Sequence, residues 1–218
     1  LAQAARSGDL HAFRPGQMLA TSRLLPRSPV YVGYVAVVAT GYSAMFSFLS
    51  ASSFVLQDGL GLGPATYALC FSVVVMGFVS GGFATQLLIR RLGIDRLIGI
   101  GSMVMIVAAV AMTAPILLGH VGVVTIVGPA ALMTMGMALN NPSAMAGAIG
   151  PFARLTGTAA ALLGFLQMTA AALVGIVVGQ LTVHSPLPMA LAMLTMAIAT
   201  MTAHRLLVLR GRRLAGTA

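Results

Sequence analysis

The sequence predicts an all-α membrane protein with six transmembrane helices. Three observations carry this prediction: the composition, the number of long runs without charge, and the placement of the arginines. Of the 218 residues, 59% are hydrophobic and only 7% are charged, and the mean hydropathy is +1.00. Soluble domains carry roughly a quarter charged residues, so this composition excludes an ordinary soluble domain.

Six charge-free runs are long enough to cross the bilayer, whose core of roughly 30 Å requires about 20 apolar helical residues. They are Val30–Leu56, Ala65–Ile89, Leu97–Leu118, Val121–Ile149, Leu155–Leu181 and Pro186–Leu207. Membrane β-strands alternate apolar and polar residues, and these runs do not. We therefore expect helices that satisfy their own backbone hydrogen bonds in lipid. They form a transmembrane domain over residues 29–209, after a cytoplasmic linker or interfacial segment (1–28) and before a basic cytoplasmic tail (210–218).

The arginines predict the orientation of these helices. All twelve basic residues are arginines, and they fall before the first run, in alternate connections, and after the last run. The positive-inside rule assigns the arginine side to the cytoplasm. We therefore expect a multi-pass protein of the bacterial plasma (inner) membrane with both termini cytoplasmic. Because little of the chain is expected to be exposed to water, the net charge of +9 indicates the membrane orientation and not a nucleic-acid-binding surface.

The titratable residues do not predict a catalytic or metal site. A membrane enzyme needs a nucleophile with a base, or clustered acids and histidines, at membrane depth. Here the acids lie in loops or tails, and three histidines lie at helix ends, where we expect solvation; these residues are Asp9, Asp58, Asp95, His120, His184 and His204. We expect neither an enzyme nor a cofactor, and no metal.

Small residues recur at spacings that favour close helix packing. Gly77–Gly81 and Gly175–Gly179 are GxxxG spacings, which let two helix backbones approach in lipid. We expect packing within the chain more than dimerisation.

One face of the first run carries four hydroxyl groups. Thr40, Ser43, Ser47 and Ser50 recur at steps of three and four residues, with Phe54 beyond them, and such steps place side chains on one helix face. This face either lines a substrate cavity or bonds back to its own helix carbonyls, a common habit of Ser and Thr in membranes.

Two further side chains are candidates for a cavity. An amide such as that of Gln167 is unfavourable in hydrocarbon unless it meets water or a partner, so it lines a cavity or bridges helices. Met133, together with Met135 and Met137, is a candidate for an adaptable apolar wall around varied ligands.

Two clusters are candidates for a gate at the inner end. Asn140 and Asn141, followed by Pro142, are expected to bridge helices there. In the loop "RRLGIDR", Arg90, Arg91 and Arg96 surround Asp95. Charge pairs in this loop either latch one access state or serve only as a positive-inside anchor.

Three blocks of the sequence resemble a known family. They are the stretch Asn141, Pro142, Ala144 and Ala146 with Pro151–Phe152, "TGTAAALLG" and Gln167; the stretch Phe46 to Phe71; and the basic loop Leu88 to Arg96. Together they resemble the Bcr/CflA-type drug exporters of the major facilitator superfamily.

The resemblance implies that these six helices are the C-terminal half of a twelve-helix transporter with inverted repeats. Such a protein exports small amphipathic, drug-like compounds by alternating access in exchange for protons. The acidic residue that handles the proton is expected in an N-terminal half absent from this sequence. The resemblance also places the last helix at the periphery, so we expect lipid contact for Met189, Met193 and Met196. An uptake carrier of the same superfamily and a non-transporting six-helix scaffold remain as alternatives.

Overall fold

The chain forms a bundle of long antiparallel helices. The computed structural model describes residues 29–152, 156–182 and 185–211, and these residues contain no strand. Within these described ranges, six helices are long and apolar enough to cross a membrane. The predicted fold class, an all-α protein with six transmembrane helices, is confirmed.

The helices overlap the six predicted runs. Their bounds are α2 (Pro29–Ser53), η3 (Phe54–Gly59), α3 (Pro64–Leu92), α4 (Ile94–Leu117), α5 (Val123–Ile149), η4 (Gly150–Phe152), α6 (Thr156–Leu181), α7 (Leu187–Ala203) and η6 (His204–Leu209). The π-helical segments η3 and η6 continue α2 and α7. The expected segment 1–28 and almost all of the tail lie outside the described residues, as does Arg154.

A single glycine joins α3 to α4. Gly93 has φ 74°, a left-handed conformation that glycine adopts without steric cost. Its N–H donates to the carbonyl of Ile89 at 3.0 Å, which ends α3, and α4 begins at the next residue.

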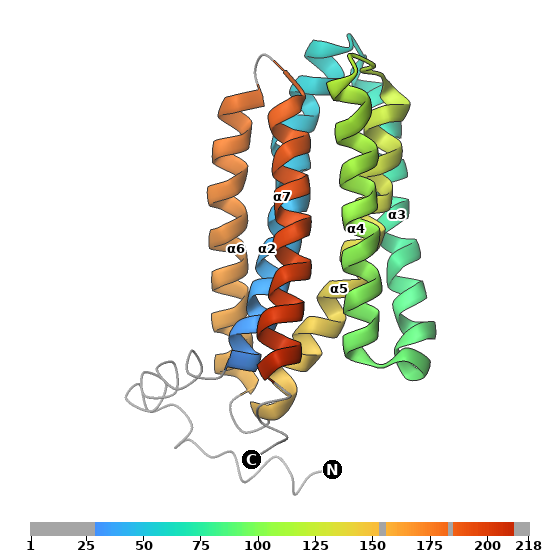
Figure 1. The fold of residues 1–218 in the computed structure, drawn as a ribbon. Helices are drawn as coiled ribbons and strands as arrows, with labels where there is room; N and C mark the ends of the chain where they lie inside the picture. The colour runs from blue at the N-terminus through green and yellow to red at the C-terminus, as the bar shows by residue number, and fades with distance from the viewer. Residues whose placement is uncertain (1–28, 153–155, 183–184, 212–218) are drawn as a thin grey trace, which may run out of the picture.

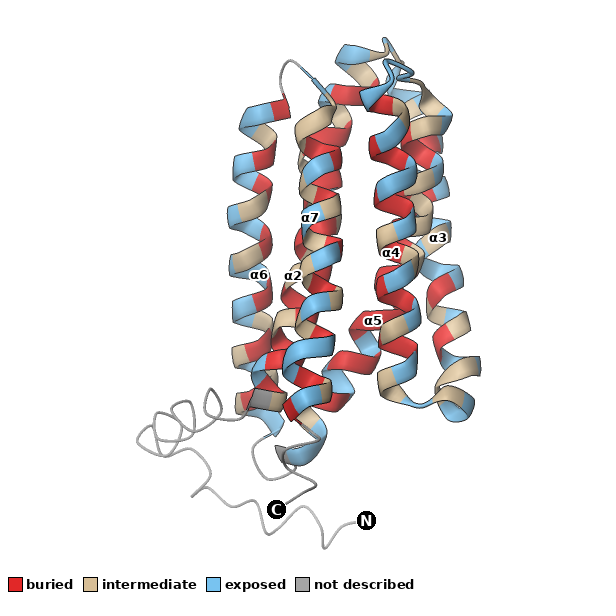
Figure 2. Cartoon of the chain, in the orientation of Figure 1, coloured by how far each residue is buried: buried red, intermediate tan, exposed pale blue. Residues whose placement is uncertain are grey.

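α2 and α5 lie at the centre of the bundle. α2 packs against α5, α6 and α7, while α5 packs against α2, α3 and α4. α3 is held mainly by α5, and α6 mainly by α2. These two helices therefore lie at opposite edges, with much of their surface exposed (Figures 1 and 2). The start of α2 and the end of α7 lie at the same end of the bundle (Figure 1).

The predicted glycine pairs pack within the chain. A Cβ at Gly77 would collide with the carbonyl of Ala131, and one at Gly81 with that of Met135, so α3 needs both glycines to reach α5. On α6, a Cβ at Gly175 would lie 2.7 Å from the Ser50 Oγ of α2. Close backbone approach thus holds both edge helices to the centre.

Methionines fill much of the core, including two for which lipid contact was expected. Met189 and Met193 are 0% and 1% exposed, and they belong to a buried cluster with Met105 and Met137. The expected lipid contact is wrong for this pair. The reason is that α7 packs against both α2 and α4, so its methionine stripe faces inward.

His204 also differs from expectation. It begins η6 and is only 3% exposed, so the expected solvation is wrong for this residue. The Cε1 of His204 lies 3.9 Å from the position of a Cβ on Gly99, so the ring lies against α4. His120 is exposed as expected, and His184 lies outside the described residues.

Candidate functional site

Asn140 bridges α5 to α4. Its side chain is fully buried, and its Nδ2 donates to the Oγ of Ser102 at 3.2 Å and to the sulfur of Met105 at 3.3 Å. Gly101 makes room for it, because a Cβ there would collide with the Asn140 amide oxygen. Asn140 thus takes the interhelical position expected from the sequence.

Asn141 lies on the other side of α5, toward α2. It is buried, and its Oδ1 has no hydrogen-bond partner among the described residues. The oxygen lies 3.6 Å from the position of a Cβ on Gly41. A buried acceptor without a donor costs about 1–3 kcal/mol. The α2–α5 seam therefore holds a buried acceptor that no described residue satisfies.

Pro142 explains a hydrogen bond between α3 and α5. Proline has no N–H, so the carbonyl four residues earlier in its helix is left without its usual donor. That carbonyl belongs to Ala138, and the Thr85 hydroxyl of α3 donates to it at 2.9 Å. The regular hydrogen bond of the helix is thus replaced at this point by a link to a neighbouring helix.

The hydroxyls of the α2 face bond to their own helix. Ser43 donates to the carbonyl of Ala39 and Ser47 to that of Ser43, both at 2.8 Å. Both serines are buried. For these two serines the geometry is the one expected if the hydroxyls donate to carbonyls of their own helix.

The other hydroxyls of this face meet neighbouring helices. The Oγ1 of Thr40 lies 2.8 Å from that of Thr200 on α7 and donates to Ala36 at 2.7 Å. Ser50 packs against Gly175 of α6. In this six-helix domain the hydroxyl face therefore lies in the seam with α6 and α7.

Gln167 lies in the seam between α6 and α2. It belongs to a buried stripe at helical spacing on α6, which contains Ala159, Leu163, Gln167, Ala171, Gly175 and Val178. The stripe faces α2, because the Tyr31 hydroxyl of α2 donates to the Ala159 carbonyl at 2.9 Å and Ser50 meets Gly175. Gln167 is 7% exposed and lies between these two contacts.

An apolar groove opens between α2 and α3, on the side of α2 opposite to the hydroxyl face. Its volume is about 210 Å³, and its lining is Tyr42, Met45, Phe48, Leu49, Phe71, Val74, Val75, Phe78 and Thr134. The sequence did not single out these residues. The available signal was the spacing of Phe71 and Phe78, two helical turns apart, which a core stripe shows equally.

Met133 does not reach this groove. It is 1% exposed and lies in the core cluster, while its neighbour Thr134 lines the groove. The Thr134 hydroxyl donates to the Val74 carbonyl of α3 at 2.8 Å. Successive residues of α5 thus face the core and the groove.

Asp95 of the basic loop contacts α2. The Tyr34 hydroxyl donates to its carboxylate at 2.8 Å. The ring of Tyr34 is buried and passes Gly147 of α5, where a Cβ would lie 2.6 Å from the Tyr34 Cζ. Tyr34 of α2 therefore contacts both α4, through Asp95, and α5, through Gly147. Arg90, Arg91 and Arg96 are exposed at the same end.

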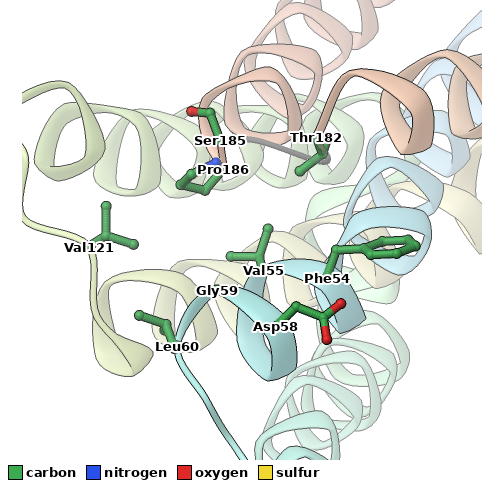
Figure 3. Close-up of a pocket in the computed structure, with 9 residues that line it drawn as sticks. All are labelled: Phe54, Val55, Asp58, Gly59, Leu60, Val121, Thr182, Ser185 and Pro186. Atoms are coloured by element: carbon green, nitrogen blue, oxygen red, sulfur yellow. The ribbon is translucent and has the colours of Figure 1, made fainter.

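Phe54 lies at the opposite end, beside another hollow. This hollow has a volume of about 590 Å³ and is lined by Phe54, Val55, Asp58, Gly59, Leu60, Val121, Thr182, Ser185 and Pro186 (Figure 3). Phe54 is 47% exposed. It therefore lies apart from the buried hydroxyls that the sequence placed with it, because η3 ends the membrane helix there.

No protein-family model and no solved structure matches the chain. The chain is similar to an MFS-type transporter. This relative is the uncharacterized MFS-type transporter YdgK of Bacillus subtilis (strain 168), which is 26% identical over 167 residues. The matched region covers 75% of this chain and 40% of the Bacillus protein. The similarity supports membership of the major facilitator superfamily, and the six helices correspond to half of such a transporter fold. It also favours a transporter over an enzyme.

Proposed function

We propose that this chain is half of a Bcr/CflA-type efflux transporter. In this proposal it exports small amphipathic compounds across the bacterial inner membrane by alternating access, coupled to protons. The observation that carries the proposal is the groove between α2 and α3. Its aromatic and aliphatic lining suits ligands recognised by apolar contact, as ligand sites of this kind commonly are.

The absence of charge at mid-depth supports an apolar, drug-like substrate. Among the described residues the acids are Asp58 and Asp95, which lie in η3 and in the first turn of α4. A carrier for sugars or organic acids usually presents charged partners, because ionisable groups in a membrane mark substrate and ion pathways. The proton site of the proposed antiporter therefore lies outside these residues.

The proposed orientation follows from the arginines. The described arginines are Arg90, Arg91, Arg96, Arg205 and Arg210, and they lie at the end of α3, at the start of α4, and in or directly after η6. These helix ends form one end of the bundle (Figure 1), hereafter the arginine-bearing end. The positive-inside rule supports a cytoplasmic position for this end, and hence for both termini.

An efflux assay tests the proposed function. The complete proposed transporter, in which this chain is joined to its N-terminal half, is produced in a drug-hypersensitive bacterium, and loss of a fluorescent amphipathic cation from preloaded cells is followed with and without an uncoupler. We expect uncoupler-sensitive efflux that Phe78→Ala slows severalfold, because this change removes apolar contact area worth about 1–3 kcal/mol.

The matched control is Phe83→Ala on the same helix. Phe83 is exposed but does not line the groove, so its variant should keep normal efflux. Inward accumulation of the cation would indicate an uptake carrier. No transport in either direction, with normal protein levels, would indicate a scaffold.

A further inference from the structure

A second hollow lies at the arginine-bearing end, between α4 and the end of α7. Its volume is about 300 Å³, and α4 and α7 pack side by side (Figure 1). We define it as the basic hollow, with Arg96, Gly99 and Met103 from α4, and Met201 and Arg205 from α7 and η6. We propose that the basic hollow binds the phosphate and one acyl chain of an anionic phospholipid. This inference does not depend on the substrate proposed above.

Two guanidinium groups supply the charge. Arg96 lies in the first turn of α4, Arg205 is the second residue of η6, and both are exposed. Arginine binds phosphate with two parallel hydrogen bonds and is less strongly hydrated than lysine. Asp95 also lines the hollow, but its carboxylate accepts the Tyr34 hydroxyl of α2.

The apolar side of the hollow extends along α4, from the arginine-bearing end toward the middle of the membrane. Arg96, Gly99 and Met103 follow at steps of three and four residues, so they share one face of α4. At 1.5 Å per residue, Met103 lies about 10 Å deeper than Arg96. Met103 is 51% exposed, and methionine adapts to flexible apolar ligands. A phosphate at the arginines would thus place an acyl chain beside Met103 and Met201.

The backbone of η6 is an independent sign of a specialised site. A π-helical turn is rare and is frequent at functional sites. Here it begins where His204 turns inward against α4 and Arg205 reaches the hollow.

A lipid fits this hollow better than a free phosphate ion. Basic pockets between transmembrane helices near the membrane surface suit anionic headgroups. A free ion would use the arginines but would leave the apolar wall of Gly99, Met103 and Met201 without a ligand. The two sources are separated in the experiment.

Fluorescence quenching tests the proposal directly. The chain has no tryptophan, so Met103→Trp places a single reporter in the hollow. The purified protein is reconstituted in phosphatidylcholine vesicles that contain a minor fraction of either phosphatidylglycerol or phosphatidylcholine with brominated acyl chains, which quench tryptophan on contact. We expect stronger quenching by brominated phosphatidylglycerol.

Charge variants in the Met103→Trp background identify the cause of this preference. Arg96→Gln and Arg205→Gln should each lower the relative binding constant for phosphatidylglycerol on the order of fivefold. Arg90→Gln removes the same charge at the same end, but Arg90 does not line the hollow, so its preference should persist. An equal loss in all three variants would overturn the proposal, since it would reflect only the general surface charge. Equal quenching by the two lipids in the parent protein would also overturn it.

Two further measurements test for a free ion and for unfolding. Inorganic phosphate added to the vesicles should leave the preference unchanged, and its loss would assign the site to a free ion instead. Folding is checked with the single cysteine, Cys70, which is buried. If it stays protected from a thiol reagent in both glutamine variants, their lost preference supports the proposal. If the glutamine variants stay folded and keep the preference, the proposal is wrong.

Discussion

The Thr85 hydroxyl of α3 donates a hydrogen bond to the Ala138 carbonyl of α5 over 2.9 Å. The same hydroxyl oxygen lies 2.9 Å from the Gly81 carbonyl of its own helix, so its single proton is shared between these two acceptors. The Ala138 carbonyl is available because Pro142 brings no N–H to it. A proline on α5 thus leaves a backbone acceptor that a side chain of the neighbouring helix α3 uses.

Thr85→Val should destabilise the protein by about 1 kcal/mol, because it leaves the Ala138 carbonyl buried without a donor. Stability is measured as the heating midpoint at which Cys70 becomes reactive to a thiol dye. In a Pro142→Ala background the helix supplies its own N–H, so Thr85→Val should cost much less. Equal costs in the two backgrounds would show that the two sites are not coupled.

Gly147→Ala should destabilise the protein, because the added Cβ would lie 2.6 Å from the Tyr34 ring, and overpacking costs about 1–3 kcal/mol. The control is Gly128→Ala on the same helix, where an added Cβ meets nothing within 4 Å. That change should be neutral or stabilising, because alanine favours helices. Equal midpoints for the two variants would contradict the packing of Tyr34 against α5.

Ser47→Ala should leave both efflux and stability nearly unchanged, the latter within about 1 kcal/mol, because among the described residues the hydroxyl bonds to the Ser43 carbonyl of its own helix alone. Phe78→Ala should lower efflux at an unchanged protein level. Reduced efflux in Ser47→Ala at normal stability would instead support the cavity interpretation of the hydroxyl face.

The number of helices and their approximate ends could be predicted from sequence, because charge-free runs are long and arginines separate them. The packing of Gly77–Gly81 and Gly175–Gly179 was also predictable, since small residues mark close approach. In contrast, the sequence does not predict which apolar face of a helix points toward the protein core. Lipid is as apolar as a protein core. The residue types in the stripe of Met189 and Met193 therefore do not distinguish contact with lipid from contact with the core.

The candidate site was harder to predict than the fold. Polar residues such as Ser47 and Gln167 were selected because polarity stands out in an apolar chain. The structure places them in helix seams, whereas the open groove is lined by aromatic residues such as Tyr42 and Phe78. Similarly, the sequence left open whether Asp95 pairs with nearby arginines, and it did not indicate the contact with Tyr34, which joins positions 61 residues apart.

The orientation of the bundle predicts which positions can be labelled from outside the cell. In a Cys70→Ala background, single cysteines at Asp58, His120 and Ser185 should react with a membrane-impermeant thiol reagent, since these residues are exposed and lie away from the arginine-bearing end. A cysteine at Arg90 should react only after the cells are permeabilised. The reverse pattern would show that the arginine-bearing end faces outward.

The central claim is that this chain forms a substrate-binding half whose proton site lies elsewhere. The most direct measurement uses the 218-residue chain alone, reconstituted in sealed vesicles with an imposed pH gradient, with protection of Cys70 as the check on folding. A proton drives transport only by binding one access state more strongly than the other, and the described acids, Asp58 and Asp95, lie at helix ends. The account predicts no gradient-driven accumulation of a fluorescent amphipathic cation. Accumulation that disappears when the gradient is collapsed would contradict it.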